Sequence, residues 1–424
     1  MVACRLKACS FERGVVVPVV LDMPVTQFLL FNSRSIMVVT MRNIKSLSYV
    51  VALSSLSAAS LAIYSSAAVA DETVVIGHVA PLTGEVAQLG KDNENGARLA
   101  VEEINAKGLV INGQKIVLEL DSEDDGADPR TATQVAQKLV DEKVVAVVGH
   151  MESGTSIPAS KIYSDAGITM ITPSATNPAL TQQGFNNVFR LVATDAQQGP
   201  ALAKYASTNL KIKTVAIVDD ATAYGQGLAD EFEKAAKKLG ISVLSRDATN
   251  DKAVDFRAIL TKIKSEKPDA IMYGGLDATG GPFTKQSAQL GLQAKVLAGD
   301  GVCSDRLAGL AGTAVDRVVC SQPGTSPEKM PGGDAFKAKY QKRYGHGMEI
   351  YAPFTYDAVY IVVDAMRRAN STDPSKIRAA MPATNYEGVT GETKFDTKGD
   401  LRNGVISIYD YQSGKKTFID QVTM

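Results

Sequence analysis

Short runs of valine and isoleucine alternate with stretches of helical spacing along most of this chain. The run KVVAVVGH at 143–150 is typical of a strand buried on both faces of a parallel sheet. A chain in which strands and helices alternate in this way folds into parallel sheets wound by right-handed crossovers. The rhythm comes in two series, 73–191 and 213–320, so we predict an α/β fold with two doubly wound lobes.

The individual elements follow from local signals. Ala97, Ala100, Val101 and Ile104 share one face of a helix expected over 91–107, and Asp128-Pro129 opens another as N-cap and first helical residue. A further helix is expected to begin near Ile157 and Pro158. Strands are predicted at 73–80, 115–121, 143–149, 168–171, 213–220, 241–247, 269–275 and 295–300. Helices at 333–343 and 352–369, with the tail after them, are expected to complete both lobes.

Residues 41–70 have the order of a secretory signal peptide. Arg42 and Lys45 precede an apolar, Ser/Ala-rich stretch at 47–63, and the small residues 68–70 lie directly before Asp71. The stretch is shorter than the roughly 20 apolar residues of a membrane span, which disfavours an anchor. We therefore expect export to the periplasm with cleavage after Ala70, and an over-extended start over residues 1–40.

Composition and motifs exclude several functions. The net charge is −1 and no basic stripe is present, which argues against nucleic acid as a partner. The sequence lacks G-x-S-x-G, H-E-x-x-H and P-loop motifs, and its three histidines are scattered, so we expect no catalysis, no metal and no cofactor. A hydrolase using Ser153 and His150 is the disfavoured alternative, because neither an acid nor an oxyanion motif is in place.

Hydroxyl-rich turns follow two strands of the first series. Ser153 comes after the strand at 143–149, and Ser174 and Thr176 come after the strand at 168–171. Ligands of open α/β sheets bind beyond such strand ends or between lobes. Hydroxyls and free N–H groups at a helix N-terminus suit a carboxylate, although simple N-capping is the ordinary alternative. Together the two turns predict a polar half-site in which Thr176 and backbone carbonyls can also receive an ammonium group.

The second series supplies acids and an aromatic residue at its strand ends. Asp219 and Asp220 follow one strand, Tyr224 opens the next helix, and Asp300 ends a later strand. A carboxylate at Asp300 facing the hydroxyls of the first lobe would complement an α-ammonium group. A turn or N-cap role for Asp300 is the commoner alternative.

Two of the four cysteines, Cys303 and Cys320, remain once residues 1–70 are removed. In an oxidising compartment we expect them to pair, which closes a loop and adds about 3 kcal/mol of stability in the chain-entropy estimate. Two free buried thiols are the alternative.

These turns also carry a family likeness. From about residue 73 onward the chain resembles the periplasmic branched-chain amino-acid-binding proteins, the leucine/isoleucine/valine-binding receptors of ABC importers. Eight motifs carry the resemblance in order: the PLTG opening that ends at Gly84, INAKGLVINGQKI (104–116), VVGHMESGTSIPAS (147–160), MITPSATNPAL (170–180), the segment 189–200, DDATAYGQGLA (219–229), YGGLD (273–277) and GVTGETKFDTKGD (388–400).

The resemblance implies a type I periplasmic binding fold with two lobes, a hinge of three crossing segments, and action as a monomer with permease subunits. Lobe I is then expected to comprise 71–194 and 323–400, and lobe II 195–322 and 401–424. The implied function is capture of an amino acid, branched-chain or related, for delivery to the permease. A sensor of a small amide or small acid on the same fold is the alternative.

The resemblance also implies a ligand site. In the family, the positions of Ser153, Ser174 and Thr176 hold the α-carboxylate and α-ammonium groups, and Asp300 stands where a glutamate usually faces the ammonium. Tyr224 and Tyr351 fall at aromatic wall positions. The full expected set is Leu89, Gly90, Glu152, Ser153, Ser174, Ala175, Thr176, Tyr224, Leu276, Asp300 and Tyr351.

Three positions depart from the family pattern. Leu89 and Leu276 replace aromatic residues, and Glu152 replaces a cysteine whose partner is also missing, since Ala127 stands there. Cys303–Cys320 resembles a replacement disulfide of another branch. A carboxylate at Glu152 beside a leucine side chain is costly, so Glu152 either turns to solvent or leaves room for a polar or cationic amino acid.

Overall fold

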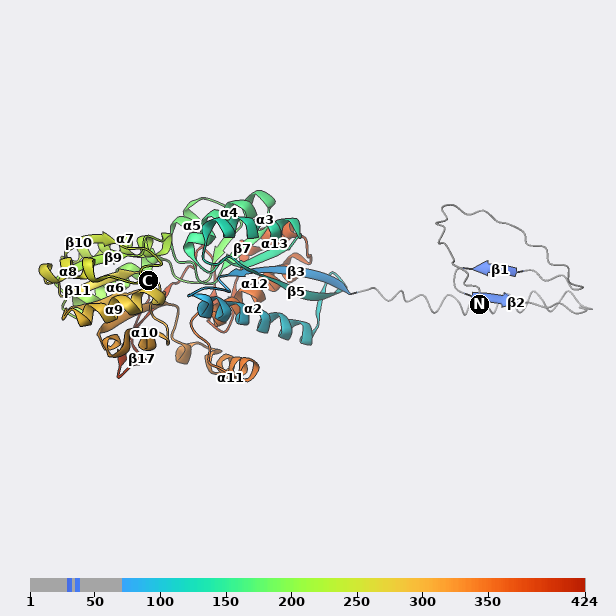
Figure 1. Ribbon diagram of the computed structural model, residues 1–424. Helices are drawn as coiled ribbons and strands as arrows, with labels where there is room; N and C mark the ends of the chain where they lie inside the picture. Colours follow the sequence, from blue (N-terminus) through green and yellow to red (C-terminus); the bar gives the residue numbers. More distant parts are fainter. Residues whose placement is uncertain (1–28, 33–34, 39–70, 424) are drawn as a thin grey trace, which may run out of the picture. The chain divides into compact units, whose positions relative to one another are not determined.

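The computed structural model describes residues 29–32, 35–38 and 71–423. The expected signal peptide over 41–70 lies outside the described residues, as does most of the expected over-extended start. The chain divides into two units, Met1–Ala68 and Val69–Met424. In the first, β1 (Leu29–Asn32) and β2 (Ser35–Val38) pair antiparallel. All that follows concerns the second unit (Figure 1).

The first of its two large sheets has the strand order β4-β5-β3-β6-β7-β8. All neighbours are parallel except β4, which runs antiparallel to β5. The strands are β3 (Glu72–Ala80), β4 (Leu109–Ile111), β5 (Gln114–Asp124), β6 (Ala146–Gly149), β7 (Thr169–Thr172) and β8 (Val188–Arg190).

The second sheet has the order β10-β9-β11-β12-β13-β16-β17. Its first five strands are parallel, and β16 and β17 are added antiparallel at one edge. The strands are β9 (Thr214–Asp219), β10 (Ser242–Ala248), β11 (Ala270–Gly274), β12 (Lys295–Ala298), β13 (Val318–Pro323), β16 (Val405–Gln412) and β17 (Lys415–Thr423). A minor pair, β14 (Tyr386–Glu387) and β15 (Glu392–Thr393), stands apart.

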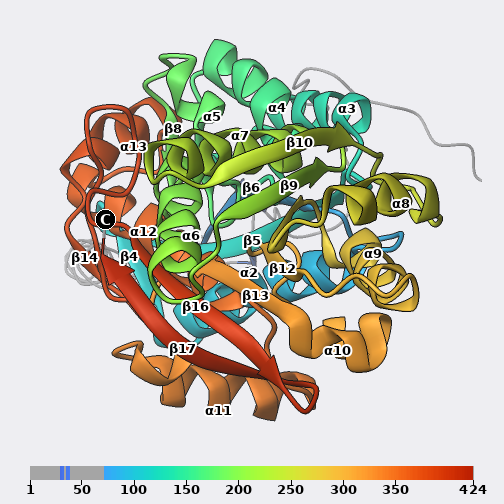
Figure 2. The ribbon, with the colours of Figure 1, turned by 90° about the vertical axis from the view of Figure 1, so that its left-hand side faces the viewer.

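Helices cover both faces of each sheet (Figures 1 and 2). On the first sheet they are α2 (Ala87–Lys107), α11 (Gly333–Tyr344), α12 (Ala352–Ala369) and α13 (Pro374–Ala380) on one face, with α3 (Pro129–Asp141), α4 (Ser153–Ala166) and α5 (Ala179–Gln182) on the other. On the second they are α6 (Asp195–Thr208) and α7 (Ala223–Lys238) on one face, with α8 (Arg257–Glu266), α9 (Asp277–Gln289) and α10 (Leu307–Ala311) on the other. Short 3-10 turns occupy Gly312–Arg317, Pro327–Lys329 and Met381–Ala383. We call the first sheet with its helices lobe I and the second lobe II.

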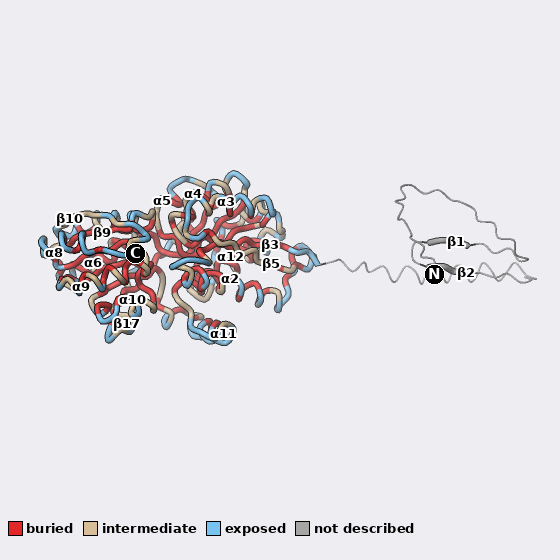
Figure 3. Tube along the Cα trace, in the orientation of Figure 1, coloured by how far each residue is buried: buried red, intermediate tan, exposed pale blue. Residues whose placement is uncertain are grey.

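The central strands are mainly apolar, and both of their faces are buried (Figure 3). In β9, Val215 and Ile217 pack under α6 and α7, whereas Ala216 and Val218 pack against the side of α8 and α9. Complete burial of such a side chain contributes roughly 1.5–3 kcal/mol. The prediction of parallel, doubly wound lobes is confirmed.

The chain passes between the sheets three times: from β8 into α6, from β13 toward α11, and from β15 into β16. The three crossing segments expected of a type I fold are therefore present. Among the described helices, none combines the length and apolar character that spanning a membrane requires.

Two predicted helix starts are wrong. α4 begins at Ser153 and not near Ile157, because Pro158 lies inside the helix, where its missing N–H costs only the bond to Gly154. α2 begins at Ala87 and not at 91, which places Leu89 and Gly90 on a helix and not in the preceding loop. The helix expected after Asp128 is confirmed, since the Asp128 carboxylate accepts hydrogen bonds from the N–H groups of Arg130 and Thr131.

The predicted strand at 143–149 is shorter than expected. Lys143 has a φ of 61°, and the N–H of Val144 bonds back to the carbonyl of Leu139 at the end of α3. Lys143 and Val144 thus close the helix, and the strand begins at Ala146. The prediction also missed the short strands β4 and β8, the buried strand β13 and the hairpin strand β17.

Candidate binding site

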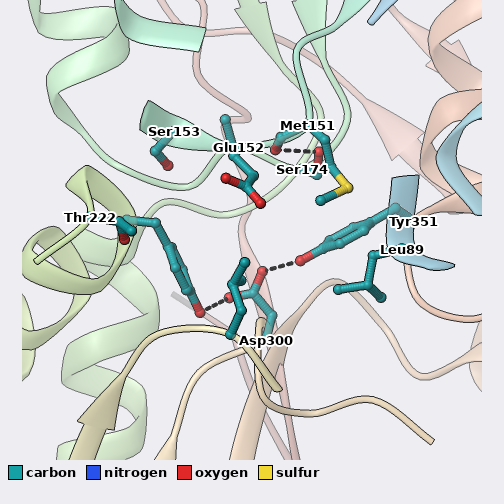
Figure 4. Close-up of a pocket in the computed structure, with 11 residues that line it drawn as sticks. Leu89, Met151, Glu152, Ser153, Ser174, Thr222, Asp300 and Tyr351 are labelled. Atoms are coloured by element: carbon teal, nitrogen blue, oxygen red, sulfur yellow. Dashed lines mark hydrogen bonds between the residues drawn. The ribbon is translucent and has the colours of Figure 1, made fainter. Parts of the chain in front are cut away.

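A cavity between the two lobes brings together most of the expected site residues (Figure 4). It encloses about 20 Å³ and shares part of its wall with a neighbouring cavity of about 270 Å³. The expected residues that line the smaller cavity are Leu89, Glu152, Ser153, Ser174, Ala175, Tyr224, Leu276, Asp300 and Tyr351.

Two expected residues do not line it. Gly90 packs instead against the backbone, since a Cβ at this position would lie 1.9 Å from the carbonyl oxygen of Pro81. Thr176 is fully buried, and its carbonyl accepts the N–H of Asp195 at the start of α6. Gly90 therefore permits a close approach of α2 to the preceding loop.

Sequence reasoning missed two lining residues, Met151 and Thr222. Met151 lies inside the hydroxyl-rich turn itself, directly before Glu152. Thr222 is the N-cap of α7, and its hydroxyl accepts the N–H of Gly225 at 3.0 Å. Thr222 could have been predicted from its position two residues before Tyr224, which was already an expected site residue.

The lobe I half of the site is built around the first turn of α4. Glu152 is the N-cap and forms no side-chain capping bond, so the helix presents its N–H groups and positive dipole end toward the cavity. Ser153 accepts the N–H of Asn177 at 3.2 Å, and the Ser174 hydroxyl donates to the carbonyl of Met151 at 2.7 Å. These bonds hold the two hydroxyl turns side by side, an arrangement that suits a carboxylate.

Asp300, at the end of β12, is the centre of the lobe II half. It accepts hydrogen bonds from Tyr224 at 2.9 Å, from Gln198 at 2.8 Å and from Tyr351 at 2.7 Å. Burial raises the pKa of its carboxyl group above the ordinary range, while the three donors act in the opposite direction. Donors fixed in this way orient the carboxylate for a cationic group.

Tyr351 reaches Asp300 from lobe I. Its backbone N–H and that of Ala352 both donate to Asp92 of α2 at 2.9 Å, which fixes the start of α12. Burial raises the pKa of the Tyr351 hydroxyl far above its usual range, and nearby Asp300 adds to this effect. The hydroxyl therefore stays protonated and serves as a donor.

Glu152 extends into the cavity toward Asp300 and not toward solvent (Figure 4). Its Oε1 atom is buried and has no hydrogen-bond partner among the described residues. Burial raises the pKa of this carboxyl group well above the ordinary range, and the charges of Asp125, Asp220 and Asp251 raise it further. Within the described chain, no lysine, arginine or histidine lines this cavity.

The lobes also meet beside the cavity. The Asn177 side chain of lobe I donates to the carbonyl of Ala223 in α7 at 2.5 Å. A Cβ at Gly227 would lie 2.4 Å from Nδ2 of Asn177, so the absence of a side chain there permits this approach.

A match to the periplasmic binding protein family covers residues 73–415. The chain belongs to this family. Its members are solute receptors and not enzymes, which confirms the expectation of a non-catalytic protein.

Similar proteins share the architecture over nearly their full length. The leucine-, isoleucine-, valine-, threonine- and alanine-binding protein of Pseudomonas aeruginosa is 36% identical over 84% of this chain and 94% of its own. The structure of the leucine-binding protein LivK of Thermotoga maritima is 29% identical, with a TM-score of 0.77 over 82% of this chain and 98% of that one. The branched-chain amino acid transporter substrate-binding protein LivJ of Streptococcus pneumoniae, solved with isoleucine, is 28% identical with a TM-score of 0.75 over 83% and 100%.

The hydrogen bonds of His150 are those of a structural residue and not of a catalytic base. Its Nδ1 lies 2.9 Å from Asp125 and its Nε2 lies 3.0 Å from the Tyr163 hydroxyl, so both ring nitrogens bond to residues other than Ser153. Both partners are buried, and the pair supports the strand end behind the site. The alternative of a hydrolase with Ser153 as nucleophile thus lacks its base.

A disulfide joins Cys303 to Cys320 in lobe II. Cys303 lies in the loop three residues after Asp300, and Cys320 lies in strand β13. Within the described residues, no cluster of histidine, cysteine and carboxylate side chains is arranged to hold a metal ion.

Proposed function

We propose that this chain is an exported receptor that captures an α-amino acid between its lobes and delivers it to an ABC-importer permease. The observation that carries the proposal is the pairing of opposite chemistries across one cavity. The N-terminus of α4 with Ser153 lies on the lobe I side, and the buried Asp300 lies on the lobe II side.

Each half suits one end of an amino acid. The helix N-terminus and the hydroxyl of Ser153 suit the α-carboxylate, and Asp300 suits the α-ammonium group. A ligand that spans both halves contacts the two lobes together only when they are closed, so its binding shifts the population toward the closed form.

The proposal also includes the lobe boundaries, the monomeric state and the cleavage site expected from the sequence. We place the lobe boundaries at 194/195, 322/323 and 400/401, close to the three passages between the sheets. The receptor acts as a monomer in the periplasm after cleavage behind Ala70. The relatives' names, which include several amino acids, support the ligand class.

The alternative of a small-acid sensor fits the cavity less well. A small acid without an ammonium group would leave Asp300 and Glu152 buried beside a ligand of the same charge, which is unfavourable. A small neutral amide avoids this repulsion but leaves the N-terminus of α4 without an anion.

Thermal shift with each common amino acid tests the proposal, because a ligand that binds the folded state stabilises it by RT ln(1 + [L]/Kd). We expect a clear upward shift with at least one α-amino acid. The matching α-keto acid, which lacks the ammonium group, and the α-amide, which lacks the carboxylate, should give little or none. A shift with the keto acid or amide alone would favour the sensor, and no shift with any amino acid would refute the proposal.

A further inference from the structure

We infer that the ligand is a basic amino acid, one whose side chain ends in an ammonium or guanidinium group received by Glu152. This inference rests on the proposed function, since it assumes that the α-amino and α-carboxylate groups bind at Asp300 and α4. It concerns the side-chain end of the ligand.

The available space lies on the side of Glu152. The cavity at Asp300 measures about 20 Å³, whereas the cavity next to it measures about 270 Å³. Glu152, Thr222 and Leu276 belong to the walls of both. A ligand anchored at Asp300 therefore extends its side chain past Glu152 into the larger cavity.

The walls of this larger cavity carry two carboxylate oxygen atoms without hydrogen-bond partners among the described residues. Asp220 is 2% exposed, and its Oδ1 accepts the N–H and hydroxyl of Thr222 at 3.0 and 2.6 Å. Its Oδ2 is buried and has no partner among the described residues, as is also true of Oε1 of Glu152. Two acceptors are thus left unsatisfied at neighbouring places in one cavity.

Charge at the mouth of the cavity favours the same ligand. The wall includes Glu85 and Asp251, which are exposed, in addition to Glu152 and Asp220, and only Lys252 opposes them. Carboxylates around a narrow opening attract cations and raise their local concentration. An aliphatic side chain would instead bury the Glu152 carboxylate without any compensation.

The burial-raised pKa of Glu152 agrees with this assignment. A buried carboxyl group that lacks a partner favours its neutral form, and a cation within contact distance restores the charged form. The site is thus incomplete at Glu152 in a way that a positively charged side chain corrects.

Titration calorimetry with charged and neutral ligands of the same shape tests the inference. Lysine is compared with norleucine and arginine with citrulline, using the exported full chain, Glu152→Gln, and the control Glu119→Gln. Glu119 is an exposed carboxylate of β5 that lines neither cavity. Glutamine keeps the shape of Glu152 and removes a buried charge, so we expect this variant to fold.

We expect the native protein to bind at least one basic ligand at least about tenfold more tightly than its neutral counterpart, a ratio typical of a single buried charge pair. Glu152→Gln should reduce that ratio to near one, and Glu119→Gln should leave it unchanged. Ratios near or below one for both ligand pairs in the native protein would overturn the inference and leave the proposed function intact.

Two further outcomes separate the possible failures. Equal losses for lysine and norleucine on Glu152→Gln would assign Glu152 to the α-ammonium group and overturn its side-chain role. Failure of every α-amino acid to bind would reject the proposed function itself.

Discussion

The hydroxyl of Tyr351 donates a 2.7 Å hydrogen bond to Oδ2 of Asp300, and this bond joins the start of α12 in lobe I to the end of β12 in lobe II. Both residues are buried, and Asp300 bonds at the same time to Tyr224 of its own lobe. One carboxylate thus connects the two lobes at the candidate ligand site. Closure of the lobes is therefore linked to the geometry of the ammonium subsite that we propose at Asp300.

Tyr351→Phe is expected to weaken amino-acid binding by about 10- to 150-fold, because the substitution removes one hydrogen bond to a charged group, worth roughly 1.5–3 kcal/mol. Calorimetry measures the effect. Tyr356→Phe is a matched control, since its hydroxyl bonds to Glu103 within lobe I. An unchanged affinity in Tyr351→Phe would show that the contact does not contribute to closure.

Ser153→Ala is expected to reduce amino-acid affinity by about tenfold, since Ser153 lines the cavity at the start of α4. Thr176→Ala should change the affinity little, because Thr176 does not line the cavity. Thermal shift across a ligand titration distinguishes the two variants. A larger loss in Thr176→Ala than in Ser153→Ala would contradict the geometry of the site.

Asp220→Asn is expected to stabilise the empty protein at alkaline pH. Burial raises the pKa of Asp220 from 3.8 to about 6, so the folded state holds this proton more tightly than the unfolded state does. The stability attributable to this group is therefore greatest below about pH 4 and falls as the pH rises through about 6. Since one pKa unit corresponds to about 1.4 kcal/mol, ionisation of Asp220 lowers the free energy of unfolding by up to about 3 kcal/mol.

Urea unfolding of Asp220→Asn and native protein at pH 4.5 and pH 8 measures this difference. The advantage of the variant should reach about 1–3 kcal/mol at pH 8 and shrink at pH 4.5. Asp334 is an exposed residue of α11, so the free energy of unfolding of Asp334→Asn should differ from that of the native protein by less than about 0.5 kcal/mol at both pH values. A destabilised Asp220→Asn at pH 8 would mean that the charge is compensated in the folded state.

Reduction of the Cys303–Cys320 disulfide is expected to lower the free energy of unfolding by about 3 kcal/mol, since the bond closes a loop with a sequence separation of 17. Thermal unfolding with and without a thiol reductant measures the loss. The double variant Cys303→Ser, Cys320→Ser should unfold at the lower temperature whether reductant is present or not. A reductant effect of the same size on that variant would exclude the disulfide as its source.

Protein recovered from the periplasm after expression of the whole reading frame is expected to begin at Asp71. N-terminal sequencing or intact mass measures the mature end. Periplasmic material that retained residues 1–40 would refute both the expected over-extended start over residues 1–40 and the cleavage site.

The architecture was predictable because fully apolar strands and intervening helices repeat along the chain, as in β9 and α7. The placement of Asp300 opposite Ser153 followed from the rule that ligands bind at strand ends, with the family likeness. The exact start of α4 was not predictable, because Glu152 at its N-cap lacks the side-chain bond that marks most helix starts.

Contacts between residues far apart in the chain could not be predicted from the sequence either. The bond from Tyr351 to Asp300 spans 51 residues, and the bonds from Asp92 that fix Tyr351 span about 260. Nothing in local spacing indicates such pairs, because they depend on how two lobes meet.

Gly227 has a consequence for how this receptor can be manipulated. The Asn177 side chain occupies the place that a side chain at 227 would need, and its amide is held by Ala223 and Ala179 on either side. A Gly227→Leu substitution would act as a wedge that props the cleft open while leaving both ligand half-sites chemically intact. Such an open form, recognisable by a larger radius of gyration in solution scattering that added ligand does not reduce, would show whether the permease selects the receptor by its shape or by its cargo.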